Sequence, residues 1–201
     1  MAYTTIDDPS LYFTAYVYSG TGSDRSFSDI GFQPDWIWIK QRNGTGNHRL
    51  IDSVRGANKL LYSTGTNAED NDTSGVVSSF DSNGYSTTNE DSTVQNTSGE
   101  TYDNWLWKAG TSFSNDASAT SIGTIDSTGS VNQTVGFSIC SYTGNGTSGA
   151  SIKHGLSTKP TTIWIKKRSA TDHWTILTQT ISLNTHLHLS QNNGAISDPM
   201  F

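Results

Sequence analysis

An internal repeat constrains the fold of this chain of 201 residues more than any other feature. Four landmarks recur in the same order: residues 18–23 as 142–147, residues 31–42 as 155–168, residues 48–51 as 173–176, and residues 60–63 as about 187–190. The second copy carries two extra residues before its proline, Pro160. Four matches in one order predict two modules that share one fold.

The second landmark contains the best strand candidate. Residues 36–39 read Trp-Ile-Trp-Ile, an alternation that places the two residue types on opposite faces of a strand. Because both types are apolar, we expect this strand to be buried. Trp38 recurs as Trp164, whereas Trp36 is replaced by Thr162. We therefore expect Trp38 and Trp164 to lie in the two cores, and Trp36 to be the exposed aromatic residue.

The rest of the sequence is typical of antiparallel β structure. Hydrophobic residues make up only 32% of the chain, but aromatic residues make up 10%, more than a disordered chain carries. Asn-Gly pairs at positions 43, 83, 145 and 193 supply the positive φ angles of tight hairpins, and no long segment has helical periodicity. The predicted fold class is all-β, with two tandem small antiparallel β-sandwich (jelly-roll-like) modules, the second of them incomplete.

The repeat divides the chain into four parts. Residues 1–10 are the candidate N-terminal anchor segment, residues 11–110 form module 1, residues 111–134 are predicted as a linker or long loops, and residues 135–201 form module 2. Module 2 has no counterpart of the aromatic strand predicted at 102–108. Because a sheet without its closing strand exposes an edge, we expect the chain to be part of a longer polypeptide, or another chain to supply the missing strands.

Charge and composition narrow the partners and the location. The net charge is −6 and the pI is about 5.1, which argues against nucleic-acid binding, since that needs clustered Lys and Arg. No apolar run approaches the roughly 18 residues that membrane insertion requires, and the N-terminal residues do not form a secretory signal peptide. We therefore expect synthesis in the cytoplasm. The single cysteine, Cys140, excludes an internal disulfide and is predicted to be a buried thiol.

Four segments, residues 3–13, 31–40, 48–59 and 79–85, resemble a known family. They are similar to tandem-module virion proteins of tailed phages, frequent in marine and cyanobacterial phages and usually called structural, tail-fibre or head-decoration proteins. The resemblance implies a β-sandwich component of the virion, either a tail fibre or a capsid decoration. It further implies other virion proteins as partners and a homo-oligomer, a trimer in the case of a fibre, without catalytic residues. Module 2 has no match to residues 52–57, so the resemblance does not imply one ligand site shared by both modules.

The alternative function is a host-cell glycan-binding adhesin, or receptor-binding protein. Trp36 beside Asp35 offers a ring that can stack on a sugar and a carboxylate that can accept hydrogen bonds. Arg49 and Arg55 lie in the segment that matches the family best and are further ligand-binding candidates. An equally good interpretation of Arg55 is a turn held by contact with Asp52, a surface ion pair of about 0 to 1 kcal/mol.

Metal binding and catalysis have weaker support. His186 and His188 share one face of a strand, but two ligands without a carboxylate do not complete a metal site, so no metal is predicted. The acidic segment 65–104 has no EF-hand order, and solvated acidic loops are favoured over a calcium site. No cofactor is therefore expected. The chain has no Gly-x-Ser-x-Gly, phosphate loop or His-Glu-x-x-His, so we predict that it is not an enzyme.

Overall fold

The computed structural model describes residues 6–71, 77–88, 95–181 and 185–197, and nearly all of their regular structure is strand. The paired strands of every sheet run antiparallel. Within these ranges the helices are the 3₁₀-helix η1 (Pro9–Leu11) and the short helix α1 (Ala117–Thr120), and none is long and apolar enough to span a membrane. The predicted all-β, antiparallel, sandwich-type fold is confirmed. Half of the predicted anchor segment, residues 1–5, lies outside the described residues.

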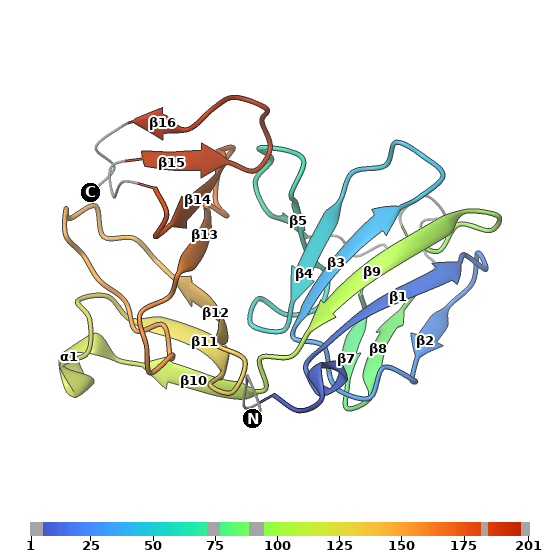
Figure 1. Ribbon diagram of the computed structural model, residues 1–201, viewed down its shortest axis with the longest axis horizontal. Coiled ribbons are helices and arrows are strands. Elements are labelled where there is room, and N and C mark those ends of the chain that lie inside the picture. Colours follow the sequence, from blue (N-terminus) through green and yellow to red (C-terminus); the bar gives the residue numbers. More distant parts are fainter. Residues whose placement is uncertain (1–5, 72–76, 89–94, 182–184, 198–201) are drawn as a thin grey trace.

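Module 1 is built from two sheets (Figure 1). The larger sheet has the order β1 (Phe13–Ser19), β9 (Thr101–Trp107), β3 (Trp36–Gln41), β4 (Arg49–Asp52), β5 (Lys59–Tyr62) and β6 (Asp70–Asn71). The smaller sheet has the order β2 (Arg25–Phe27), β8 (Gly84–Thr87) and β7 (Ser79–Asp81). Strand β9 comes from the far end of the module's sequence and pairs with β1 on one side and β3 on the other. It therefore joins β1 to the rest of the larger sheet.

The core of module 1 fills the space between its two sheets. Ile37 and Ile39 of β3 are 0% exposed there, and the rings of Tyr18 on β1 and Phe27 on β2 meet across the sheets at 4.8 Å. The cluster also contains Ile30, Phe32, Ile51, Leu60, Val77, Tyr85, Tyr102 and Leu106. Trp38 is not among its buried residues, so the prediction that it fills this core is wrong. Because side chains alternate between the two faces of β3, the isoleucines lie in the core and the tryptophans lie on the other face of the sheet.

Module 2 places its strands in two separate sheets. One has the order β10 (Thr111–Asn115), β11 (Ser127–Asn132) and β12 (Phe137–Tyr142), and the other has the order β13 (Thr162–Lys166), β14 (Trp174–Thr178), β15 (Thr185–His188) and β16 (Ile196–Ser197). Because β10 and β11 belong to the same sheet as β12, module 2 begins in the structure at residue 111 and not at 135. Residues 111–134, predicted as a linker or long loops, instead form β10, α1 and β11. Their many Ser, Thr and Gly residues give no apolar alternation, and the strands are defined instead by the backbone pairing of β10 with β11 and of β11 with β12.

The strand registers correct the repeat by one residue. Ile37 pairs with Ile51 in module 1, and Ile163 pairs with Leu177 in module 2. Ile51 therefore corresponds to Leu177 and not, as the sequence alignment has it, to Ile176. In the fourth landmark, Leu61 pairs with Leu50 and Leu187 pairs with Ile176, so Leu61 corresponds to Leu187 and not to His188. This correction is also one residue, but in the opposite direction. The correction matters because a one-residue slip moves every side chain of a strand to the other face of the sheet.

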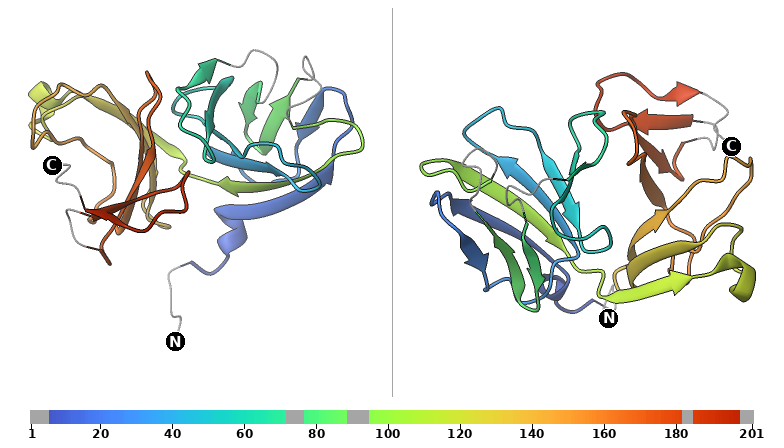
Figure 2. Two further views of the ribbon diagram at one scale, coloured as in Figure 1. Left: turned by 90° about the horizontal axis from the view of Figure 1, so that it is seen from above. Right: turned by 180° about the vertical axis from the view of Figure 1, so that it is seen from behind.

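The two modules pack together through the outer face of the larger sheet (Figure 2). The rings of Trp38 and Trp164 meet edge-on at 5.8 Å, and Trp36 meets Phe137 edge-on at 6.5 Å. We call this contact the aromatic joint, and it consists of Trp36, Trp38, Leu50, Leu61, Phe137, Trp164, Trp174 and Leu189. Trp36, predicted at the surface, is half-buried in the joint, whereas Trp164, predicted in a core, is 39% exposed.

Candidate functional site

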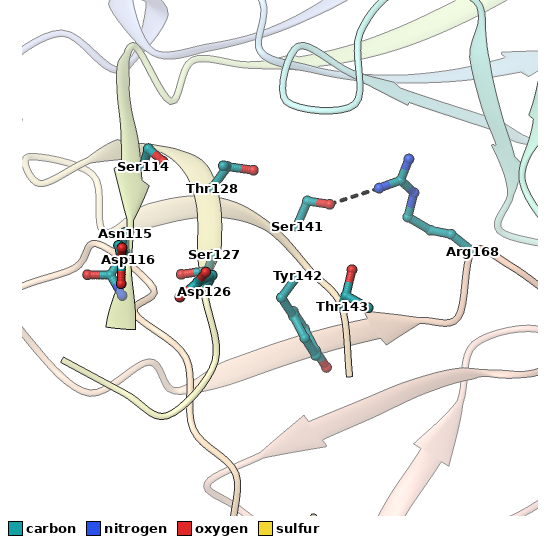
Figure 3. Close-up of a pocket in the computed structure, with 10 residues that line it drawn as sticks. All are labelled: Ser114, Asn115, Asp116, Asp126, Ser127, Thr128, Ser141, Tyr142, Thr143 and Arg168. Atoms are coloured by element: carbon teal, nitrogen blue, oxygen red, sulfur yellow. Dashed lines mark hydrogen bonds between the residues drawn. The ribbon is translucent and has the colours of Figure 1, made fainter. Parts of the chain in front are cut away.

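A polar pocket of about 330 Å³ lies on the sheet formed by β10, β11 and β12 (Figure 3). Ser114 on β10, Thr128 on β11 and Ser141 on β12 stand opposite one another across the three strands. Residues opposite one another in a sheet share one face, so their hydroxyls form a line. Arg168, from the loop after β13, reaches the end of this line, where Nη1 donates to Ser141 Oγ at 2.8 Å. We call the three hydroxyl residues, together with Arg168, the hydroxyl row.

Two carboxylates lie at the other end of the pocket and hold local backbone. Asp116 caps the N-terminus of α1 and accepts hydrogen bonds from the Ser118 hydroxyl at 2.7 Å and the Ala119 N–H at 3.0 Å. These bonds, the Ser118 hydroxyl first, lower the pKa of Asp116. Asp126 accepts a hydrogen bond from the Ala117 N–H at 2.8 Å. With the hydroxyl row, these oxygens provide donors and acceptors suited to the hydroxyls of a sugar.

Arg168 also joins the pocket to module 1. Its Nε and Nη2 atoms each donate to a carboxylate oxygen of Glu69 at 2.8 Å, which makes a bidentate ion pair. The hydrogen bond to Glu69 raises the pKa of Arg168, so the guanidinium stays charged. Burial acts to raise the pKa of Glu69, but hydrogen bonds and positive charge from Arg168 and Arg55 outweigh it, and the pKa of Glu69 is lowered. The ion pair therefore fixes one end of the hydroxyl row.

Arg55, predicted as a ligand-binding candidate, is buried with its side chain 5% exposed. Its Nε donates to Asp52 at 2.5 Å, and its Nη1 donates to Glu69 at 3.1 Å and to the carbonyl oxygen of Lys59 at 3.1 Å. The contacts favour the alternative interpretation, a turn held by Asp52, but the ion pair is buried and not at the surface as expected. Glu69 extends that pair across the modules to Arg168, and we call these four charged residues the Glu69 network.

The other predicted sugar-binding residues also lie inside the fold. Asp35 is 3% exposed and accepts hydrogen bonds from the N–H groups of Ala109 at 2.8 Å and Gly110 at 2.6 Å, so it fixes the chain between β9 and β10. Trp36 packs in the aromatic joint, and Arg49 is buried on the same face of β4 as the core residue Ile51. The structure does not bring Asp35, Trp36, Arg49 and Arg55 together on an open surface.

The metal candidates His186 and His188 lie side by side on β15. Their Nε2 atoms are 3.2 Å apart, within hydrogen-bond distance of each other, and the ring of His173 stacks on His188 at 4.1 Å. Within the described parts of the chain, no group of three or more His, Cys, Asp or Glu side chains is arranged to hold a metal ion. Three carboxylates of the acidic segment, Asp72, Glu90 and Asp91, lie outside the described residues.

Sequence reasoning missed the hydroxyl row. Ser114 and Thr128 fall in the segment predicted as linker, and Arg168 ends the second landmark of the repeat without being singled out there as a binding residue. The available signal was the alternation around Phe113, where Ser112 and Ser114 flank one aromatic residue with the period of a half-buried strand.

Comparison with known proteins gives one match. A family model described as a domain of unknown function (DUF7483) matches residues 8–201, which is nearly the whole chain. No curated protein and no solved structure matches the chain. Its function therefore has to be argued from its own residues and contacts.

Proposed function

The chain belongs to the DUF7483 family, and we propose that it is a structural component of a tailed-phage virion, either a tail fibre or a capsid decoration. Two kinds of support bear on this role. The segments at 31–40, 48–59 and 79–85 resemble tandem-module virion proteins. The single observation that carries the proposal is the joint between the modules, which holds two β-sandwich-type modules in one orientation.

The joint combines apolar packing with polar contacts. Leu50, Leu61 and Trp174 are buried at its centre, and the indole Nε1 of Trp174 donates to the carbonyl oxygen of Tyr62 at 2.8 Å. The Glu69 network adds a charged contact beside the apolar one. Domains of one chain move relative to each other unless their interface is large and apolar. A joint that holds both modules in one orientation suits a protein that carries modules outward from a particle.

The proposal places the protein in the virion after synthesis in the host cytoplasm. Its partners would be other virion proteins and further copies of itself, three in the case of a fibre. The role requires no catalytic step, cofactor, nucleic acid or membrane insertion.

Locating the protein in intact particles tests this role. Antibodies against the purified chain would be used for immunogold electron microscopy of a phage that encodes it, with quantitative mass spectrometry of purified particles. We expect labelling at one place on the capsid or tail and a fixed copy number per particle. If the protein is abundant in infected cells but missing from purified particles, the proposal is wrong.

The hydroxyl row supports a second candidate function, binding of a host-cell glycan. Its groups are polar, lie in a pocket of about 330 Å³ and include a guanidinium, so the sugar would be held by hydrogen bonds rather than by the predicted stacking on Trp36. Thr128→Val removes one hydroxyl with little change in shape. Thr111→Val is the control, because Thr111 is exposed on β10 outside the pocket.

A glycan array read with both variants tests this candidate. One lost hydrogen bond of about 0.5–1.5 kcal/mol should weaken binding by Thr128→Val up to about tenfold, while Thr111→Val binds like the wild type. Absence of glycan binding by the wild type, or an equal loss in both variants, would rule out the row as a sugar site.

A further inference from the structure

Strand β9 has a defined place in module 1. It lies between β1 and β3, with Tyr102 opposite Tyr18 of β1 and Leu106 opposite Ile37 of β3. The ring of Tyr102 stacks on that of Tyr18 at 5.1 Å, and Leu106 is 0% exposed. β9 therefore completes the backbone pairing of the sheet and also covers the core residues beside it.

The corresponding place in module 2 holds no described strand. β12 corresponds to β1, because Tyr142 matches Tyr18 in the first landmark, and β13 corresponds to β3. β12 ends one sheet and β13 ends the other, and Figure 1 shows them as neighbours. An end strand presents backbone N–H and C=O groups that can pair with a further strand. Among the described residues, β12 and β13 therefore offer two edges where module 1 has β9.

The side chains around this place are more exposed than their counterparts. Ile37 is 0% exposed, but Ile163, at the same position of the repeat, is 41% exposed. Tyr18 is 6% exposed, and its counterpart Tyr142 is 45% exposed. Tyr142 is among the residues that line the polar pocket, but Figure 3 shows its ring pointing away from Ser141 and Arg168. The two residues that face β9 in module 1 are thus left open in module 2.

We infer that module 2 accepts a β-strand between β12 and β13, donated by a partner protein rather than by a second copy of this chain, from a segment with the side-chain pattern of β9. The pattern alternates Tyr102, Asn104 and Leu106 on the core side with Trp105 and Trp107 on the other side. Main-chain hydrogen bonds to both edges would supply affinity, and the alternate side chains would supply specificity, as in other cases of strand addition. The donated Tyr would cover Tyr142, and the donated Leu would cover Ile163.

A charge argument also favours a strand of this pattern. The β13 edge ends on Lys166, and in module 1 the equivalent Lys40 stands opposite Asp103 of β9. A donated strand with an acidic residue at that position would place opposite charges side by side, which favours the pairing. This inference does not depend on the virion role, because it rests only on the comparison of the two modules.

A peptide with the sequence of residues 99–109 is the probe, added to the full chain. Hydrogen exchange of backbone amides, read by mass spectrometry, measures strand pairing directly. We expect saturating peptide to slow exchange in β12 and β13 by at least about tenfold, with other sheet edges unchanged. The matched control is the same peptide with Tyr102→Ser and Leu106→Ser, which keeps the backbone groups but removes the core side chains and should have no effect at equal concentration.

A variant of the acceptor provides an independent check. Ile163→Asp adds a charge at the open position, and we expect it to weaken peptide binding at least about tenfold. Because Ile163 is 41% exposed, module 1 should remain folded, as read by exchange in β3. Three results would overturn the inference: no slowing in β12 and β13, equal slowing by the control peptide, or slowing without peptide that grows with protein concentration. The last result would assign the edge to a second copy of this chain.

Discussion

Replacing the same residue at the same position of the two modules should have unequal effects. Ile37→Ala removes three carbon atoms from a core position that is 0% exposed. At about 0.8 kcal/mol per carbon, the lost transfer free energy is about 2.4 kcal/mol, and the cavity left behind places the total in the range of about 2–5 kcal/mol. Ile163 is 41% exposed, so about three fifths of its surface is buried and the transfer cost falls to about 1.4 kcal/mol. No closed cavity forms there.

Urea unfolding followed by circular dichroism measures the two costs. We expect Ile37→Ala to lower the free energy of unfolding by at least about 1 kcal/mol more than Ile163→Ala, with the slope against urea unchanged. Val17→Ala is the control, because Val17 is 56% exposed on β1 and should cost less than about 0.5 kcal/mol. Equal losses for Ile37→Ala and Ile163→Ala at low protein concentration would refute the argument that the two modules differ in coverage.

Three further predictions follow from single contacts. Because the pKa of Glu69 is lowered in the folded protein, its charge stabilises the fold above its unfolded pKa, and this contribution is lost as the pH falls through the lowered folded value. Glu69→Gln should therefore flatten the pH dependence of the urea midpoint below about pH 5, and an unchanged acid slope would contradict this. Gly84 has a φ of +154°, and an added Cβ would lie 1.6 Å from the carbonyl oxygen of Phe27, so Gly84→Ala should cost more than about 3 kcal/mol. Its control, Gly144→Ala, adds a Cβ with nothing within 4 Å and should stay within about 0.5 kcal/mol of the wild type in the same urea assay. Dialysis against a chelator should leave the thermal midpoint unchanged, since described carboxylates such as Asp81 already accept hydrogen bonds from Ser79 and Ser86; a midpoint several degrees lower would support calcium.

Local pattern predicts the strands of this protein well where side chains are large. The alternation at residues 36–39 is enough to place β3, and the repeat then places β13, because both depend on a few neighbouring residues. The same reasoning fails for β10 and β11. Their residues are mostly Ser, Thr and Gly, so little in their sequence distinguishes a strand from a loop, and only the pairing of β10 with β11 and of β11 with β12 decides between them.

Sites that depend on tertiary contacts could not be predicted in this way. Asp35 and Trp36 look like a sugar-binding pair because they are adjacent in sequence, yet Asp35 accepts hydrogen bonds from residues 109 and 110, more than seventy positions away. Arg168 and Glu69 are 99 residues apart. No spacing rule links such residues, so the Glu69 network is visible only when the two modules are packed together, and the hydroxyl row only when the strands of module 2 are paired.

The two modules share a sequence pattern, including the tryptophan of the central strand, but equivalent side chains differ in their exposure. Trp38 and Trp164, which occupy the same position of the repeat, contact each other in the aromatic joint at 5.8 Å, and neither fills the core of its own module. The joint therefore occupies the outer faces of both central strands. The surfaces of module 2 that the joint leaves open include the core-facing side of β13 with Ile163 and the edges of β12 and β13. A chain built in this way would add its next partner at a different surface from the one that joins its own two modules.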